Sequence, residues 1–189
     1  MLALALLLGL LAAGPAPAQT TTPAPPQARA PAAPFETPRR IPAPGGEVLI
    51  THPGEQRAYD EMKFAPARRA GDTLYISGVI AGVPPGGAAD AEAFKRSLRH
   101  AFSRIQKLLE AAGASYADVV MINTFHVWTS PHASLTRDQH FDAVSQVKDE
   151  FMRPPHPAWT AVGTSGLLGD GGLVEIQMIA HVPERRRGR

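Results

Sequence analysis

The chain has 189 residues, of which 44% are hydrophobic, and its formal net charge is +2. This length suits one domain with an extension, and so small a charge does not indicate a nucleic-acid-binding protein. The sequence contains no cysteine, which excludes disulfides, thiol nucleophiles and thiolate metal sites. Stability must therefore come from a packed core or from association of subunits.

The N-terminal part divides into two segments. Residues 1–18 hold an apolar run and the small-residue pattern APA at 16–18, which predict a signal peptide and export to a bacterial periplasm. A retained anchor is the main alternative, and a cytosolic protein with a misassigned start is a weaker one. Residues 19–46, rich in Pro, Ala and Thr, are interpreted as a disordered linker. The folded domain is expected over 47–183, and residues 184–189 form a basic, solvated tail.

The domain begins with strand patterns. Alternation predicts a short strand over Glu47–Thr51, ended by a turn at residues 52–54. Phe64–Ala70 is expected to be an edge strand or irregular, because Pro cannot donate to a sheet ladder. A longer strand is predicted over Asp72–Ile80, where Gly78 allows either a β-bulge or the close approach of backbone or ligand.

Two helices follow, separated by another strand. Asp90–Ala112 has apolar residues at helical spacing and a capping residue at its start, so it predicts the most regular helix. Asp118–Trp128 predicts a central strand. A second helix is predicted over Thr136–Met152, with four apolar side chains directed inward: Phe141, Val144, Val147 and Phe151.

The C-terminal stretch from Pro157 ends in a strong strand after Gly- and Ser-rich turns. One face of that strand is apolar throughout, and the other carries Glu175 and Gln177. The order of elements predicts a layered α+β domain with a mixed sheet and both helices on one face. The uncovered face predicts a homo-oligomer that buries it, whereas an ordinary solvated face is the simpler alternative.

No metal or cofactor site is predicted. The seven histidines include no helical i, i+4 pair, and neither a Walker sequence nor a dinucleotide fingerprint is present. His126 and His181 lie in predicted strands, where a hydrogen-bonded structural histidine is commoner than a catalytic one.

Several short motifs, in order over residues 64–182, resemble the RidA (YjgF, L-PSP) family. They are LYISG at 74–78, LLEAAGAS at 108–115, Pro157-Ala158 and VEI at 174–176. The resemblance implies a chorismate-mutase-like subunit, a homotrimer, and small-molecule clefts between subunits. Well-known members hydrolyse reactive enamines and imines to keto acids and ammonia, others are named endoribonucleases, and others bind small molecules without an established reaction.

The family's cleft residues are only partly retained. Gly78 and Glu175 match, and the resemblance implies that Glu175 positions or activates water. Trp159 occupies the position of the arginine that grips the substrate carboxylate, and an indole cannot replace that guanidinium. Three further positions differ from the deaminating members: Phe64 replaces a tyrosine, Ser145 an asparagine and Ala161 a thiol. Ser77, Thr160 and Gln177 complete the expected ligand cleft.

These differences predict a cleft of aromatic, less charged character, in which hydrolysis of carboxylate-bearing imines is weak or absent. Trp159 and Phe64 either form a stacking wall for a planar ligand, or Trp159 fills space at a subunit interface. Two functions remain open: an imine or enamine hydrolase whose substrate lacks the carboxylate, and a non-catalytic exported trimer that binds a ligand or partner. An endoribonuclease ranks third, because no basic stripe with aromatics is present.

Overall fold

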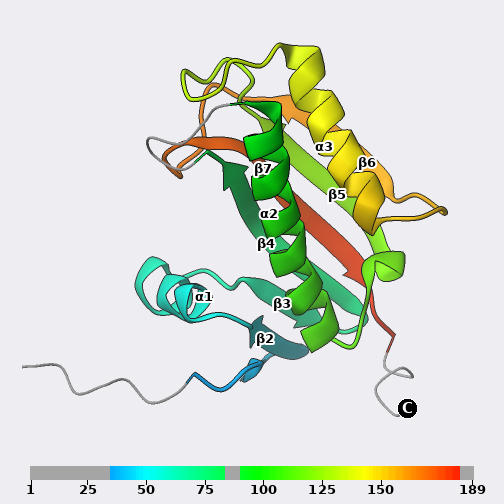
Figure 1. Ribbon diagram of the computed structural model, residues 1–189. Coiled ribbons are helices and arrows are strands. Elements are labelled where there is room, and N and C mark those ends of the chain that lie inside the picture. Colours follow the sequence, from blue (N-terminus) through cyan, green and yellow to red (C-terminus); the bar gives the residue numbers. More distant parts are fainter. Residues whose placement is uncertain (1–34, 84–89, 184–189) are drawn as a thin grey trace, which may run out of the picture. The chain divides into compact units, whose positions relative to one another are not determined.

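Seven strands form one mixed sheet in the order β1-β2-β3-β4-β7-β5-β6. The computed structural model describes residues 35–83 and 90–183, which belong to one compact unit (Figure 1). All strand pairs are antiparallel except β5 with β6. The strands are β1 (Arg39–Ala43), β2 (Gly46–Ile50), β3 (Ala67–Ala70), β4 (Thr73–Gly82), β5 (Val119–His126), β6 (Ala158–Gly163) and β7 (Gly172–His181).

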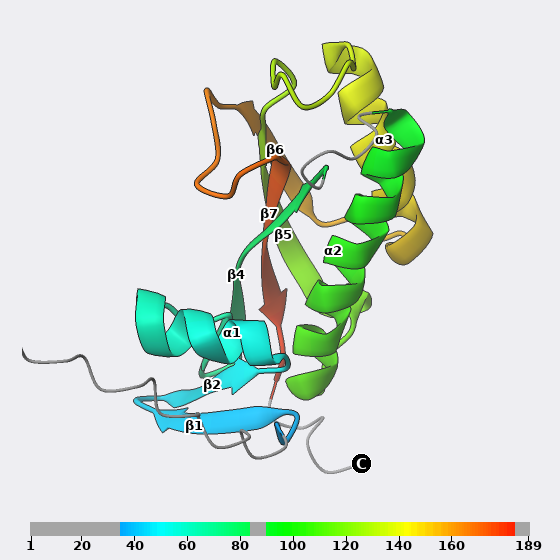
Figure 2. The same ribbon diagram turned by 60° about the vertical axis from the view of Figure 1, so that its left-hand side comes forward.

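Two long helices, α2 (Ala91–Ala111) and α3 (Arg137–Phe151), lie on the same side of strands β4, β7, β5 and β6 (Figure 2). The loop between β6 and β7 projects from the opposite side. The prediction of an α+β domain with both long helices on one face of a mixed sheet is confirmed. The shorter helical elements are α1 (Pro53–Arg57), the π-helical turn η1 (Ala58–Met62) and the 3-10 turn η2 (Tyr116–Asp118).

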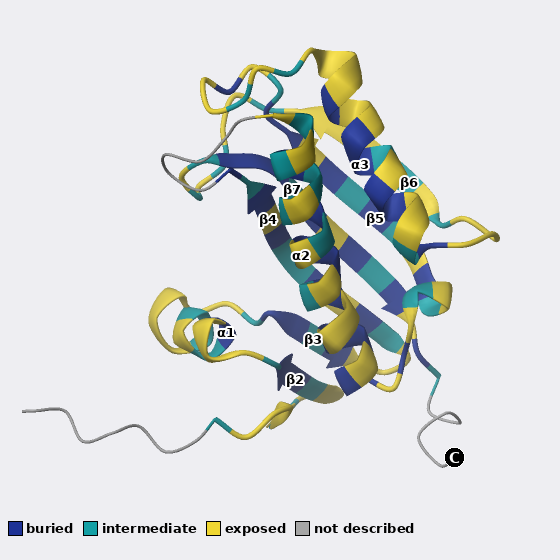
Figure 3. Cartoon of the chain, in the orientation of Figure 1, coloured by how far each residue is buried: buried dark blue, intermediate teal, exposed yellow. Residues whose placement is uncertain are grey.

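The helix α2 forms where the sequence pattern predicted it. The Asp90 carboxylate accepts a hydrogen bond of 2.7 Å from the Ala93 N–H and so satisfies one free donor of the first turn. Gly113, with φ of 75°, ends the helix in a left-handed conformation. Its buried stripe faces the sheet (Figure 3) and includes Phe94, Leu98, Ala101, Phe102, Ile105, Leu108 and Leu109.

The helix α3 begins with a reciprocal cap. The Thr136 hydroxyl accepts from the Gln139 N–H, and the Gln139 side chain accepts from the Thr136 N–H. Val144 and Val147 are buried as predicted. The inward position predicted for Phe141 is wrong: its side chain is 40% exposed, because it lies over the margin of the sheet at β6 rather than over its centre.

The core lies between these helices and the central strands. On β7, the predicted apolar face is buried, with Val174, Ile176, Met178 and Ala180 all at 1% exposure or less. On β4 the register shifts between Ile76 and Val79, so a β-bulge contains Gly78. The exposed apolar side chains on the strands of the opposite face include Tyr75, Ile80, Val120 and Phe125.

The N-terminal strands were not fully predicted. Strand β1 lies within the stretch interpreted as linker, so the folded unit begins before Glu47. It is a mostly exposed edge strand containing a proline and has little apolar signal. The segment after β2 was predicted to be a turn, but Pro53 starts helix α1, where Pro is well tolerated.

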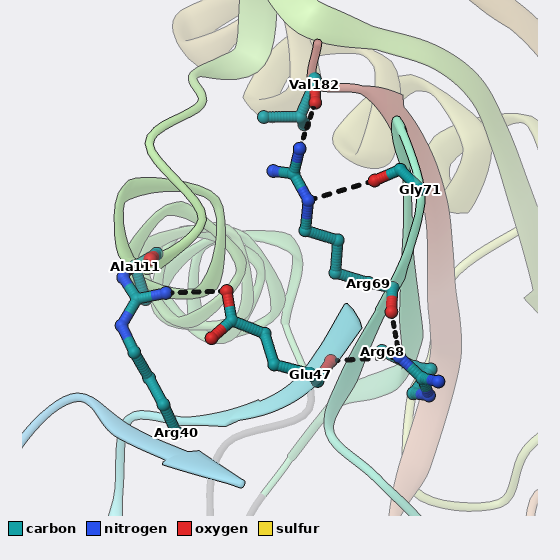
Figure 4. A network of polar contacts seen from close by, with 7 residues as sticks. All are labelled: Arg40, Glu47, Arg68, Arg69, Gly71, Ala111 and Val182. Atoms are coloured by element: carbon teal, nitrogen blue, oxygen red, sulfur yellow. Dashed lines mark hydrogen bonds and ion pairs between the residues drawn. The ribbon is translucent and has the colours of Figure 1, made fainter. Parts of the chain in front are cut away.

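Arginines tie these strands to the rest of the fold (Figure 4). The buried Arg69 side chain donates to the carbonyl oxygens of Gly71 at 3.0 Å and Val182 at 2.5 Å. Arg40 pairs with Glu47 at 2.8 Å and also donates to the Ala111 carbonyl at the end of α2. These bonds join β1, β3, α2 and the segment after β7.

Two predictions lie outside the described residues: the signal peptide at 1–18 and the basic tail at 184–189. Within the described ranges, no helix has the length and apolar character needed to cross a membrane.

Candidate functional site

The Glu175 side chain of β7 lies directly over Gly78 of β4. A Cβ atom at position 78 would be 1.7 Å from Glu175 Oε1 and 2.5 Å from its Cδ, which is impossible without movement. The β-bulge predicted at Gly78 is observed, and the group that approaches the residue closely is the Glu175 side chain, whereas backbone or a ligand was predicted. The bulge brings backbone under the carboxylate and fixes where the carboxylate rests.

This carboxylate borders a hollow of about 360 Å³ on the face of the sheet opposite α2 and α3. Phe125 of β5 and Gln177 of β7 line it with Glu175 and Gly78, and the β6–β7 loop covers one end through Thr164, Gly166, Leu167 and Leu168. Within residues 35–83 and 90–183, Glu175 forms no hydrogen bond or ion pair. Its oxygens are therefore available to a water molecule or a ligand.

Neighbouring polar groups are held in place. Gln177 Oε1 accepts a hydrogen bond of 3.1 Å from Asn123 Nδ2 of β5. Thr160 of β6 is paired with Asn123, so it belongs to the same face of the sheet and is exposed. The Ser77 hydroxyl donates to the Ala65 carbonyl at 2.6 Å, which anchors the segment carrying the half-exposed Phe64.

Trp159 lies on the other face of the sheet, beneath α3. Its indole N–H donates to Thr124 Oγ1 at 2.9 Å, and its ring stacks on Phe141 with centroids 5.2 Å apart and planes 14° from parallel. Lys148 Nζ is 5.5 Å from the Trp159 ring centroid. The stacking partner of Trp159 within the chain is thus Phe141, not Phe64.

Two further predicted site residues, Ser145 and Ala161, lie on the same side of the sheet as Trp159. Ser145 borders a hollow of about 340 Å³ with Trp159 and Lys148, and Ala161 borders a larger one with His126. The predicted site residues thus divide into two groups within one chain. Gly78, Glu175, Gln177 and Thr160 belong to the open face of the sheet, whereas Ser145, Trp159 and Ala161 belong to the side of α3.

A buried relay of hydrogen bonds extends from Trp159. Thr124 Oγ1 is 2.8 Å from His126 Nε2, and His126 Nδ1 is 3.0 Å from His140 Nε2. Burial lowers the pKa of His126, and burial together with His126 lowers the pKa of His140 to about 4. Both imidazoles are therefore neutral at pH 7. The prediction that His126 is hydrogen-bonded and structural is consistent with these contacts.

Sequence reasoning missed Lys148, which lies beside the Trp159 ring, and His140, which is linked to Trp159 through Thr124 and His126. Both are on α3, and no spacing rule connects them to a residue on β6. Phe141 was predicted to point into the core, but it is partly exposed and stacks on Trp159. Among the described residues, no group of three or more His, Cys, Asp or Glu side chains is arranged to hold a metal ion.

The fold and the paired Gly78 and Glu175 define a class of small α+β proteins with a carboxylate on an open sheet face. Comparison with known proteins identifies the class. A sequence model of the family described as endoribonuclease L-PSP matches residues 55–182. The RutC family protein YjgH of Escherichia coli (strain K12) is 35% identical over 133 residues, which cover 70% of this chain and 92% of that protein.

Solved structures agree with this match. A structure of protein YJGH has a TM-score of 0.51 and 34% sequence identity, covering 67% of this chain and 88% of its own. A RidA structure from the Antarctic bacterium Psychrobacter sp. PAMC 21119 has a TM-score of 0.50 and 30% identity, covering 63% and 88%. The chain belongs to the RidA (YjgF, L-PSP) family, as the sequence motifs predicted.

Proposed function

We propose that this protein is a hydrolase of reactive imines or enamines whose substrate carries no carboxylate. The observation that carries the proposal is the Glu175 carboxylate, which lies on Gly78 at the edge of a hollow and has no partner among the described residues. A carboxylate so placed is suited to act as a general base towards water.

The proposed reaction has two steps. Glu175 takes a proton from water while the water oxygen adds to the imine carbon and the electrons of the C=N bond pass to nitrogen. The nitrogen gains a proton from solvent and a carbinolamine results. Glu175 then returns its proton to the amino nitrogen, ammonia leaves with the C–N bonding electrons, and the carbon–oxygen double bond forms as the hydroxyl proton is released to solvent. Water and imine thus become a carbonyl compound and ammonia without any oxidant or reductant.

The choice of substrate rests on Trp159. Its single N–H donor is occupied by Thr124, and its ring is stacked on Phe141. The indole therefore offers a substrate carboxylate neither a charge nor a free donor. Loss of a buried bidentate ion pair typically costs about 2–5 kcal/mol, which is enough to select against carboxylate-bearing imines.

The proposal includes a homotrimer, exported to the periplasm, with the ligand between subunits. Its support is the exposed apolar surface of the open face, where Tyr75 is 49%, Val120 51% and Phe125 36% exposed. Such a surface is typical of a subunit interface. Contact between copies would also allow the open-face residues around Glu175 of one subunit to meet the residues around Trp159 of another.

The test compares imines made in place by an amine oxidase with imines made by an amino-acid oxidase, which retain the carboxylate. The native protein should accelerate decay of the first kind only, and Glu175→Gln should abolish that acceleration. Glu92→Gln, an equal change on the exposed surface of α2, is the control and should have no effect. Acceleration that survives in Glu175→Gln would refute the proposed base.

A non-catalytic binding protein is the second candidate, and the enclosed contacts of Trp159 favour it because they leave the indole without a free donor. It predicts no acceleration with either imine and unchanged ligand affinity in Glu175→Gln. An endoribonuclease, the activity in the family description, is the third. Cleavage of RNA by protein freed of contaminating nucleases would raise its rank.

A further inference from the structure

A second cavity, of about 520 Å³, lies between the first turns of α3 and the ends of β5 and β6. It shares no lining residue with the hollow beside Glu175. Its walls are aromatic, formed by Trp128 and Phe141, and its polar lining includes His140, Asp138 and Asp142. None of these five residues serves as a catalytic group in the proposed hydrolysis.

The aromatic walls are fixed by their packing. Trp128 lies so close to Gly163 of β6 that a Cβ atom there would be 2.2 Å from two carbons of the indole ring. The Phe141 ring is held by its stacking on Trp159. Two aromatic side chains therefore face the same cavity without needing to move first, which reduces the entropy lost on binding.

The charged groups at the cavity give it a negative character. Arg137 forms an ion pair of 3.1 Å with Asp138, so these two charges compensate each other. Asp142 has no hydrogen bond or ion pair among the described residues. Because His126 and His140 are neutral at pH 7, no imidazolium opposes a positive ligand, and one negative charge remains uncompensated.

One polar residue of the lining, His140, is almost fully buried. Its side chain is 1% exposed, and its Nδ1 atom is buried without a hydrogen-bond partner in the described part of the chain. Such a group is disfavoured unless something else satisfies it. Its other ring nitrogen is engaged by His126, so Nδ1 is left without a partner in the described part of the chain and is closed off from solvent.

We propose that this cavity binds a small organic cation, an amine or ammonium group attached to an apolar or aromatic body. The faces of Trp128 and Phe141 attract the cation and cover the apolar body, and the Asp142 carboxylate supplies the counter-charge. This site is independent of Glu175 and of the proposed hydrolysis.

Tryptophan fluorescence tests the proposal with little ambiguity, because the chain contains two tryptophans and Trp159→Phe leaves Trp128 as the single reporter. The substitution keeps an aromatic ring to stack on Phe141. The full chain carrying it is titrated with benzylamine, with its neutral analogue benzyl alcohol and with the anion benzoate. We expect benzylamine to bind about tenfold more tightly than benzyl alcohol, and benzoate not to bind.

A paired substitution tests the counter-charge. Asp142→Asn should weaken benzylamine binding about three- to tenfold and leave benzyl alcohol unchanged. Asp170→Asn, an equal change of charge on the exposed β6–β7 loop, should affect neither. Equal affinity for amine and alcohol, preference for benzoate, equal loss in both variants, or no response to any of the three probes at millimolar concentration would each overturn the proposal.

Discussion

The contact between Gly78 and Glu175 gives the sharpest prediction. In Gly78→Ala, the new methyl group would be 1.7 Å from Glu175 Oε1, whereas ordinary contacts begin at 3.4 Å. The carboxylate must therefore retreat by about 1.7 Å, the difference between these values. Since a displacement of about 1 Å at a reacting group can reduce a rate about 100-fold, we expect imine hydrolysis to fall at least that far.

The same substitution should leave the fold intact. The group in the way is the end of a flexible side chain, and Ala in place of Gly restricts the unfolded chain, so we expect the free energy of unfolding to change by no more than about 1 kcal/mol. Urea denaturation measures this change, and the amine-oxidase assay measures the rate. Gly166→Ala is the matched control, because it borders the same hollow and has no atom within 4 Å of its added Cβ. Native rates in Gly78→Ala would refute the proposed catalytic role of the Glu175 carboxylate.

Three further predictions concern stability, all measurable by urea denaturation. Because the pKa of His140 is lowered to about 4 in the native state, the unfolded chain binds more protons than the native state below the ordinary histidine pKa. His140 should therefore reduce the free energy of unfolding by about 2–3 kcal/mol as the pH drops from 6.5 to 4, and a flat profile would contradict this. Arg69→Met should cost about 3 kcal/mol, since it leaves the Gly71 and Val182 carbonyls without their donor; a loss under 1 kcal/mol would count against this. Asp90→Ala should cost about 1 kcal/mol through the lost helix cap, and no loss would contradict it.

The elements that could be predicted from the sequence have a regular spacing of apolar residues and residues that mark where the element begins or ends. Helix α2 has both an apolar stripe and the Asp90 cap, and β7 alternates cleanly around Glu175. Strand β6 gave no such signal. It is an edge strand, partly or fully exposed along its whole length, so neither alternation nor an apolar run distinguished it from a loop. Strand β1 was hidden for the same reason within a proline-rich stretch.

The candidate site was predictable to a smaller extent. The family motifs identified Gly78 and Glu175, and the structure brings them into contact. The partners of Trp159 could not be deduced, because Thr124 on β5 and Phe141 on α3 meet it only through tertiary packing. His126 and His140 are linked to it only through Thr124. Which face of β6 a residue occupies depends on its pairing with β5, and no local pattern specifies that register.

The face that each residue occupies also explains how this chain differs from the deaminating members that its motifs resemble. Gly78 and Glu175, which are retained, both lie at the open face. Three of the four altered positions, Ser145, Trp159 and Ala161, lie instead on the side of α3. The substitutions are thus concentrated among the residues that would bind the substrate, while the residues suited to activating water, Gly78 and Glu175, are kept. A protein altered in this way is expected to retain the chemistry of water addition and to change the molecules it accepts.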